Sequence, residues 1–214
     1  MEEVTRDGRL LLIKVGPLGG FANNAYVIAD SNTNDAVIID APAESEQAVA
    51  AAKGLNVRQI IVTHRHPDHW AGIETLLAGI EAPVYTHEAD REPYAAYVKG
   101  TLDDGEEVEV GSLKLRVIHT PGHTPGSFCL RLGEHLISGD TLFPGGPGRT
   151  RSPELLAQEI ESIVSRLHTL PDSLHVYPGH GANTTIAESK AEYAVFAGKQ
   201  HDPNLSGDVL WLKS

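Results

Sequence analysis

The sequence has little cysteine, no long apolar segment and few basic residues. Its single cysteine, Cys129, excludes an intrachain disulfide, and its place in the strand-like run 127–130 predicts a small buried side chain rather than a nucleophile. No apolar stretch approaches the roughly 18 residues that a membrane-spanning helix needs. The charged residues 1–7 also lack the apolar core of a signal peptide. We therefore expect a cytoplasmic protein with no membrane partner.

The charge balance argues against a nucleic-acid partner. The chain carries 29 acidic and 17 basic residues, a formal net charge of −12, whereas proteins that bind nucleic acids present a basic face. Its 214 residues, 41% of them apolar, are enough for one sizeable globular core. We expect a single domain over residues 1–214, with the stretches 145–148 and 202–208 as loops rather than linkers.

The most informative segment is residues 63–69, which read THRHPDH. It follows the apolar run 60–62, which is typical of a short buried strand, and Pro67 disfavours a continuing helix or ladder. The side chains therefore lie on a loop at a strand end, and imidazole nitrogen and carboxylate oxygen are good ligands for zinc. So short a loop cannot aim all four side chains at one ion. We predict that His64 and His66 face one metal, and Asp68 and His69 a neighbouring one.

Three later residues complete the pattern. A strand-like apolar run precedes each of them, and a glycine lies directly before each, where it permits a sharp turn and a close approach. These residues are His123, Asp140 and His180. Taken singly, each would be an ordinary loop residue. Together with residues 63–69 they predict a metal cluster assembled from several strand ends.

These motifs, together with the segments 23–26, 39–40, 139–143 and 148–150, resemble the metallo-β-lactamase-fold hydrolase superfamily. Within it the chain is most similar to single-domain glyoxalase-II-like (hydroxyacylglutathione hydrolase-like) proteins. The resemblance implies an α/β fold, a four-layer αββα sandwich of two mixed sheets flanked by helices. It also implies a ligand set: His64, His66 and His123 for the first metal, Asp68, His69 and His180 for the second, and Asp140 bridging both.

The same resemblance implies two Zn(II) ions per chain, with iron or manganese as alternatives, and a hydroxide shared by the metals as the nucleophile. Metal coordination lowers the pKa of bound water to about 7, so no side-chain nucleophile is required. Asp68 and Asp140 are thus the candidate catalytic residues. Asp68 is either a ligand or a general base. Asp40 is the candidate that orients an imidazole, or else simply ends its strand.

The periodicity of the sequence predicts alternating strands and helices. The expected strands are residues 10–15, 26–29, 37–39, 59–62, 84–86, 108–110, 113–118, 128–132, 135–138 and 174–177. The expected helices are residues 44–53, 70–78, 154–169 and 184–200, with some helical turns within 88–99.

The expected substrate is a small-molecule acyl thioester of the S-lactoylglutathione type, because its thiolate leaving group, with a pKa near 8.5, needs little acid assistance. Arg149 and Arg151 either contact a substrate carboxylate or cap their loop. Only 34 residues follow His180, so we expect loose binding of the glutathione portion.

Two other functions remain open. One is a persulfide dioxygenase with a single Fe(II) held by His64, His123 and Asp140. The other is a non-catalytic binding protein that keeps a vestigial site. The sequence predicts no particular oligomeric state.

Overall fold

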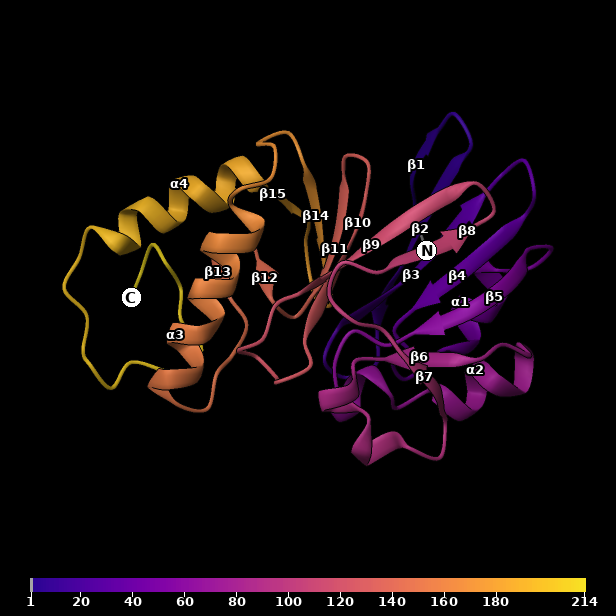
Figure 1. Cartoon of the computed structure of the whole chain (residues 1–214), viewed down its shortest axis with the longest axis horizontal. Coiled ribbons are helices and arrows are strands. Elements are labelled where there is room, and N and C mark those ends of the chain that lie inside the picture. Colours follow the sequence, from indigo (N-terminus) through magenta and orange to yellow (C-terminus); the bar gives the residue numbers. More distant parts are fainter. Residues whose placement is uncertain (1) are drawn as a thin grey trace.

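The computed structural model describes residues 2–214, and its core consists of two facing β-sheets (Figure 1). The first sheet has seven strands whose spatial order is their sequence order: β1 (Glu2–Asp7), β2 (Leu10–Leu18), β3 (Asn23–Asp30), β4 (Asp35–Ile39), β5 (Asn56–Ile61), β6 (Val84–Thr86) and β7 (Val98–Thr101). The second has six, in the order β15 (Thr184–Thr185), β14 (His175–Pro178), β11 (His135–Gly139), β10 (Phe128–Leu132), β9 (Leu113–His119) and β8 (Glu107–Val110). A two-stranded ribbon pairs β12 (Leu142–Phe143) with β13 (Gly146–Pro147).

Helices cover the outer face of each sheet. They are α1 (Glu46–Ala51) and α2 (Ile73–Gly79) on the first sheet, and α3 (Pro153–Ser162) and α4 (Ile186–Ala197) on the second. No helix among residues 2–214 combines the length and apolar character needed to cross a membrane.

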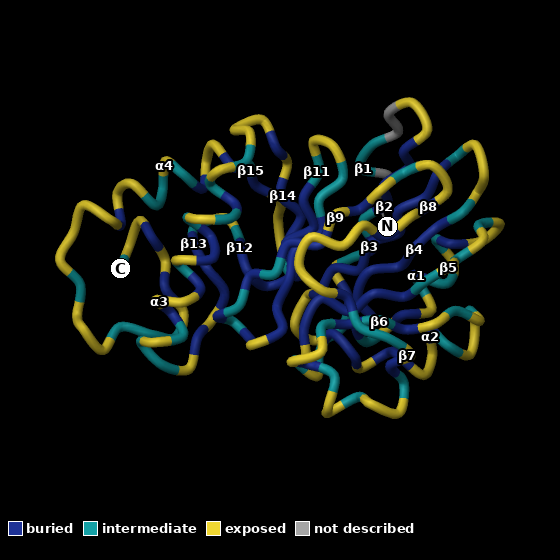
Figure 2. Tube along the Cα trace, in the orientation of Figure 1, coloured by how far each residue is buried: buried dark blue, intermediate teal, exposed yellow. Residues whose placement is uncertain are grey.

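Three buried apolar clusters correspond to the three interfaces between four layers. Strand β3 shows why, because its side chains alternate between two of them: Val27 joins the cluster beneath α1 and α2, whereas Tyr26 and Ile28 join the cluster between the sheets. The third cluster includes Leu156 and Phe196 and lies between the second sheet and its helices. Strands buried on both faces appear as a continuous dark core in Figure 2. The αββα prediction is confirmed.

The strands that precede the candidate ligands end at one edge of the sandwich. In the second sheet, β9 and β11 are both antiparallel to β10, and β14 is parallel to β11, so these three strands run the same way and end together. Backbone hydrogen bonds join this edge to the first sheet, from Asn24 N to Gly179 O at 2.7 Å and from Phe128 N to Thr63 O at 3.3 Å. The edge is therefore where segments distant in sequence meet.

Several local predictions were wrong in detail. Residues 88–99 contain the expected helical turns, as η2 (Glu88–Asp90) and η3 (Glu92–Tyr94), but the chain then enters β7, which we had not predicted. The long third helix is regular only to Ser162 and continues as a π-helical turn over Ile163–Leu167. The last helix starts at Ile186, because 184–185 first pair with β14. Strands β1, β12 and β13 were also missed. The sequence of β1 is mostly polar, and β12 and β13 are each only two residues long, too short to show strand periodicity.

Candidate metal centre

Residues 63–69 leave β5 and form a loop that ends in one 3-10 turn, η1 (Pro67–His69). The proline at the first helical position fits there, because its missing N–H would have no partner. Asp40, at the end of β4, holds the start of the loop, since its Oδ1 accepts a hydrogen bond from Thr63 N at 2.8 Å. Asp40 itself has a left-handed backbone with φ of 64°, a conformation that is uncommon outside glycine and asparagine. The chain thus fixes the loop through a buried carboxylate.

The first group of candidate ligands consists of His64, His66 and His123, each of which offers one nitrogen within 4.8 Å of the others. His66 Nδ1 lies 2.8 Å from His123 Nε2. His64 Nε2 is buried and has no hydrogen-bond partner among the described residues. Burial and the neighbouring His69 keep the pKa of His64 well below its usual value, and burial and His123 lower the pKa of His66 to about 4. These imidazoles are therefore neutral near pH 7.

The second group consists of Asp68, His69 and His180. His180 Nε2 lies 3.2 Å from His69 Nε2 and 3.2 Å from Asp68 Oδ2. Burial opposes a charge on His180, but hydrogen bonds to Asp140 and Asp68 outweigh it and raise its pKa to about 10. Without a metal these carboxylates hold a proton on the ring, and a bound cation would take the place of that proton.

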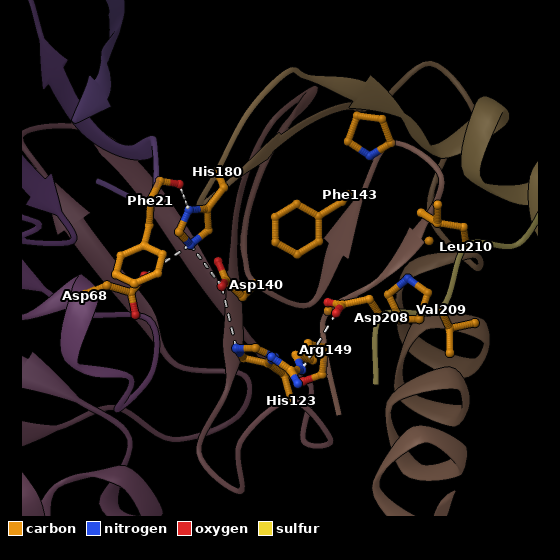
Figure 3. Close-up of a pocket in the computed structure, with 14 residues that line it drawn as sticks. Phe21, Asp68, His123, Asp140, Phe143, Arg149, His180, Asp208, Val209 and Leu210 are labelled. Carbon is orange, nitrogen blue, oxygen red and sulfur yellow. Dashed lines mark hydrogen bonds and ion pairs between the residues drawn. The ribbon is translucent and has the colours of Figure 1, made fainter. Parts of the chain in front are cut away.

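Asp140 lies between the two groups. Its Oδ2 is 3.6 Å from His123 Nε2 and 3.2 Å from His180 Nε2 (Figure 3). Its Oδ1 is 3.3 Å from His69 Nε2. This approach requires glycine at position 179, because a Cβ there would lie 2.2 Å from Asp140 Oδ1. One carboxylate thus contacts both groups, as a bridging ligand would.

The hydrogen bonds that the histidine rings form on the side away from the cluster show which ring nitrogen faces the cluster. His123 Nδ1 donates to Arg149 O at 3.0 Å, and His180 Nδ1 donates to Phe21 O at 2.8 Å. A carbonyl oxygen only accepts, so Nδ1 carries the hydrogen in both rings, and in a neutral ring Nε2 presents its lone pair to the cluster. His69 Nδ1 is held in the same way by Asp40 Oδ2 at 2.9 Å.

Converging lone pairs and carboxylate oxygens repel one another unless a cation lies between them. The donors are imidazole nitrogens and carboxylate oxygens, the set that Zn(II), Fe(II) and Mn(II) accept, and Asp140 Oδ1 is a further buried atom with no hydrogen-bond partner in the described chain. The cluster therefore fits divalent transition metals, and all seven predicted ligands lie within it.

The structure adds residues that we had not assigned to the site. Asn23 donates from Nδ2 to Asp68 Oδ2 at 2.8 Å, while Asn24 and Tyr26 both donate to Pro178 O, at 2.9 and 2.6 Å, beside the loop of His180. The segment 23–26 is one of the family motifs, so the sequence did contain a signal for these three residues. Nothing in the sequence marked a further residue, Asp90, as part of the site.

Asp90 is a buried carboxylate that joins the two ligand-bearing loops. It accepts hydrogen bonds from Arg65 N at 3.0 Å, from Gly126 N at 3.0 Å and from the Thr124 hydroxyl. Arg65 lies between His64 and His66, and Thr124 follows His123. Asp90 thus sets the spacing between the loops without touching the cluster.

We expect Asp90→Asn to lower the free energy of unfolding by about 2–3 kcal/mol, because an amide nitrogen would face backbone donors in a buried site. Urea denaturation of the metal-free protein measures this. Glu88→Gln is the matched control, since Glu88 lies on the same short turn and forms only an exposed ion pair at 3.5 Å with Arg91. Equal stabilities of the two variants would contradict the role given to Asp90.

The predicted arginines lie near the cluster but not in it. Arg149 lines the cavity beside Asp140, and its exposed side chain has Nε 3.8 Å from Asp208 Oδ2. Arg151 lines the neighbouring groove. His119, the non-ligand closest in sequence to His123, stacks on His87 at 4.2 Å between ring centroids and contacts Pro125 O, away from the cluster.

An αββα sandwich with a His/Asp cluster at the common edge of its sheets defines a metal-dependent hydrolase. Residues 18–199 match the Metallo-beta-lactamase superfamily. The chain belongs to this superfamily, as its motifs had predicted.

The relatives and solved structures agree with this assignment. The chain is 35% identical over 208 residues to an "Uncharacterized protein" of Aquifex aeolicus, covering 88% of this chain and 98% of that one. It is 37% identical over 162 residues to a "Hydroxyacylglutathione hydrolase" of Anaeromyxobacter dehalogenans, covering 75% of this chain but only 62% of that relative.

Among solved structures, ETHE1 from Myxococcus xanthus aligns with a TM-score of 0.75 and 31% identity, covering 88% and 86% of the two chains. TTHA1623 in a di-iron-bound form aligns with a TM-score of 0.71 and 29% identity, covering 83% and 96%.

Proposed function

We propose that this protein hydrolyses small acyl thioesters at a centre of two Zn(II) ions. His64, His66 and His123 would hold the first ion, Asp68, His69 and His180 would hold the second, and Asp140 would be a ligand to both. The observation that carries the proposal is the convergence of seven nitrogen and oxygen donors beside a cavity of about 450 Å³. The name of the Anaeromyxobacter relative supports the thioester class.

The bound metals would supply a Lewis acid and a water ionised near neutral pH. The chain's own residues hold the ligand rings in one orientation, through Asp40 for His69 and through backbone carbonyls for His123 and His180. Hydrolysis adds the water oxygen to the acyl carbon and breaks the C–S bond, which yields a carboxylic acid and a thiol. Cys129 takes no part as a nucleophile, because burial raises the pKa of its thiol to about 11.

Asp68 is a ligand rather than a general base in this proposal. Its Oδ2 already accepts from Asn23 and lies 3.5 Å from His69 Nε2 and 3.2 Å from His180 Nε2. That oxygen is therefore directed at the second group of donors.

The reaction class is tested with zinc-loaded protein and three kinds of substrate: S-lactoylglutathione, a β-lactam and a phosphodiester. We expect kcat/KM for the thioester to exceed the others by at least about 100-fold, because a thiolate leaves without protonation whereas an amine must be protonated. Chelation should abolish turnover, and zinc should restore it. A faster β-lactam or phosphodiester would exclude the thioester assignment, and no turnover of any substrate would favour a non-catalytic binding protein.

We also expect the protein to bind the thiol portion of the substrate only weakly. Arg149 and Arg151 are exposed, and exposed ion pairs contribute about 0–1 kcal/mol. Replacing glutathione by a truncated thiol should therefore lower kcat/KM by less than about tenfold. A loss of a hundredfold would show a dedicated glutathione pocket.

The alternative is a persulfide dioxygenase that uses one Fe(II). His64, His123 and Asp140 favour it, because Asp140 Oδ2 lies 3.9 Å from His64 Nε2 and 3.6 Å from His123 Nε2, so two imidazoles and a carboxylate could share one ion. Oxygen consumption by Fe(II)-loaded protein with glutathione persulfide would support this alternative. The complete second group of donors favours the hydrolase.

A further inference from the structure

Apart from the candidate ligands, Arg149 and Asp208, the side chains that line the cavity beside the cluster are apolar. Asp68, His123, Asp140 and His180 form its floor, and Arg149 and Asp208 lie at its rim. Its remaining walls are made by Phe21, Phe143, Pro144, Pro147, Val209 and Leu210. In Figure 3, Phe143 lies in the space between His180 on one side and Leu210 on the other. An apolar group in this space would therefore contact apolar side chains next to the reacting centre.

The wall opposite His180 comes from the C-terminal segment, residues 206–214. Backbone bonds fix this segment, because Gly207 and Thr150 exchange hydrogen bonds of 2.9 and 3.2 Å, and Trp211 N donates to Gly145 O at 2.8 Å. The Trp211 side chain is fully buried in the outer core. Position 146 must be glycine, since a Cβ there would lie 2.7 Å from Val209 O. The C-terminal segment is thus a built wall of the cavity.

A second groove, of about 770 Å³, reaches the cluster from another direction and has different chemistry. It shares Phe21, Asp68, His123 and Arg149 with the cavity and adds Arg151. Its remaining lining is His66, Pro67, Thr150, Ser206 and Gly207, so apart from Phe21 and Pro67 the groove is lined by polar side chains and backbone. A thioester has two arms on either side of its carbonyl carbon. The site therefore offers an apolar space for one arm and an arginine-bearing groove for the other.

We propose that the acyl chain of the substrate lies in the cavity walled by the C-terminal segment, and that its polar thiol carrier lies in the groove of Arg149 and Arg151. This inference rests on the proposed thioester hydrolysis and narrows its substrate class to thioesters with an apolar acyl chain of several carbons. Burial of methylene groups favours the chain in the cavity. Asp208, at the rim, disfavours an anionic group there and offsets part of the charge of Arg149.

Chain length provides the test. Zinc-loaded wild-type protein is assayed with the acetyl and hexanoyl thioesters of N-acetylcysteamine, a neutral thiol. Each buried methylene is worth about fourfold, so the hexanoyl ester should have a kcat/KM at least about 20-fold higher. Binding of hexanoate and acetate to the same protein is measured by calorimetry, and hexanoate should bind at least about tenfold more tightly.

Two variants locate the effect. Leu210→Ala should reduce the hexanoyl-to-acetyl ratio by at least about threefold, and folding should survive because this side chain is 42% exposed. Leu212→Ala is the matched control: it is on the same segment, 53% exposed, and does not line the cavity. The control should leave the ratio unchanged.

The outcomes separate this inference from the proposed function. Thioester turnover with equal rates for the two chain lengths, or an equal response of both leucine variants, would overturn the inference and leave thioester hydrolysis standing. No turnover, with hexanoate bound more tightly than acetate in a manner that depends on Leu210, would overturn thioester hydrolysis but support the apolar cavity. No turnover with equal binding of the two acids would overturn both.

Discussion

Replacing Asp140 with alanine is expected to lower kcat/KM by at least about 1,000-fold, equivalent to about 4 kcal/mol of transition-state stabilisation. Asp140 contacts both groups of donors, through Oδ1 at 3.3 Å from His69 and Oδ2 at 3.2 Å from His180. Burial raises the pKa of Asp140, but His69 and His180 outweigh burial and hold it well below its usual value, so the carboxylate stays ionised. Alanine would remove its charge from both groups at once.

His180→Ala provides the comparison, because it removes a donor from the second group only. We expect it to cost at most about 100-fold, since the first group of histidines remains complete. Both variants are compared with wild type under saturating zinc, with the metal content of each measured, and Asp208→Asn serves as a control for loss of an exposed carboxylate near the cavity. Losses that are equal, or larger for His180→Ala, would mean that Asp140 does not bridge.

The sequence predicted that the candidate ligand side chains lie close together, because the information that places them is local. His64, His123, Asp140 and His180 each follow a short apolar run, and in an αββα sandwich such runs become strands that end at one edge. The loop 63–69 itself indicates that its side chains face two metals. The 3-10 turn that begins at Pro67 carries His69 in a different direction from His66. Nothing distant in the chain had to be known for these predictions.

The supporting residues could not be predicted in the same way because they depend on long-range contacts. Asp90 joins Arg65 and Gly126, which lie 25 and 36 residues away. No pattern around Asp90 marks it as buried. The wall formed by Val209 and Leu210 depends likewise on where the C-terminal segment meets the ribbon of β12 and β13.

The same distinction explains the missed strands. β1 carries charged residues at the edge of the first sheet, where only its partner β2 demands a strand. β7 pairs with β6 in parallel, with a register shift, and contains Gly100. In each case the neighbouring strand decides the structure, and local propensity does not.

The cluster places several ionisable groups in the interior at a cost that a metal would offset. His64, His69 and Asp140 are all buried, and burial of charged or unpaired polar groups is unfavourable unless they coordinate a metal or pair with one another. The hydrogen bonds at Nδ1 of His69, His123 and His180 keep the Nε2 atoms of these rings directed inward even without a metal. The metal-free protein should therefore be markedly less stable than the loaded one.

We expect two transition-metal ions per chain and a large thermal shift on saturation with zinc. At a free concentration 1,000 times the dissociation constant, each site contributes about 4 kcal/mol, so two sites contribute about 8 kcal/mol. For a chain of this size, 1 kcal/mol raises Tm by about 2–4 °C. Because the unfolded THRHPDH segment also binds metal, we expect a rise of at least about 10 °C.

Elemental analysis of protein purified without chelator and then reconstituted gives the metal count, and calorimetry gives Tm. His180→Ala is the matched variant: it should bind one ion and show about half of the thermal shift, because His64, His66 and His123 remain. The stability readout does not depend on any substrate, so it tests the metal centre even if the thioester assignment is wrong. A ceiling of one ion per wild-type chain under saturating zinc would exclude the two-metal centre. It would leave His64, His123 and Asp140 as the ligands of a single ion, which is the arrangement that the dioxygenase requires.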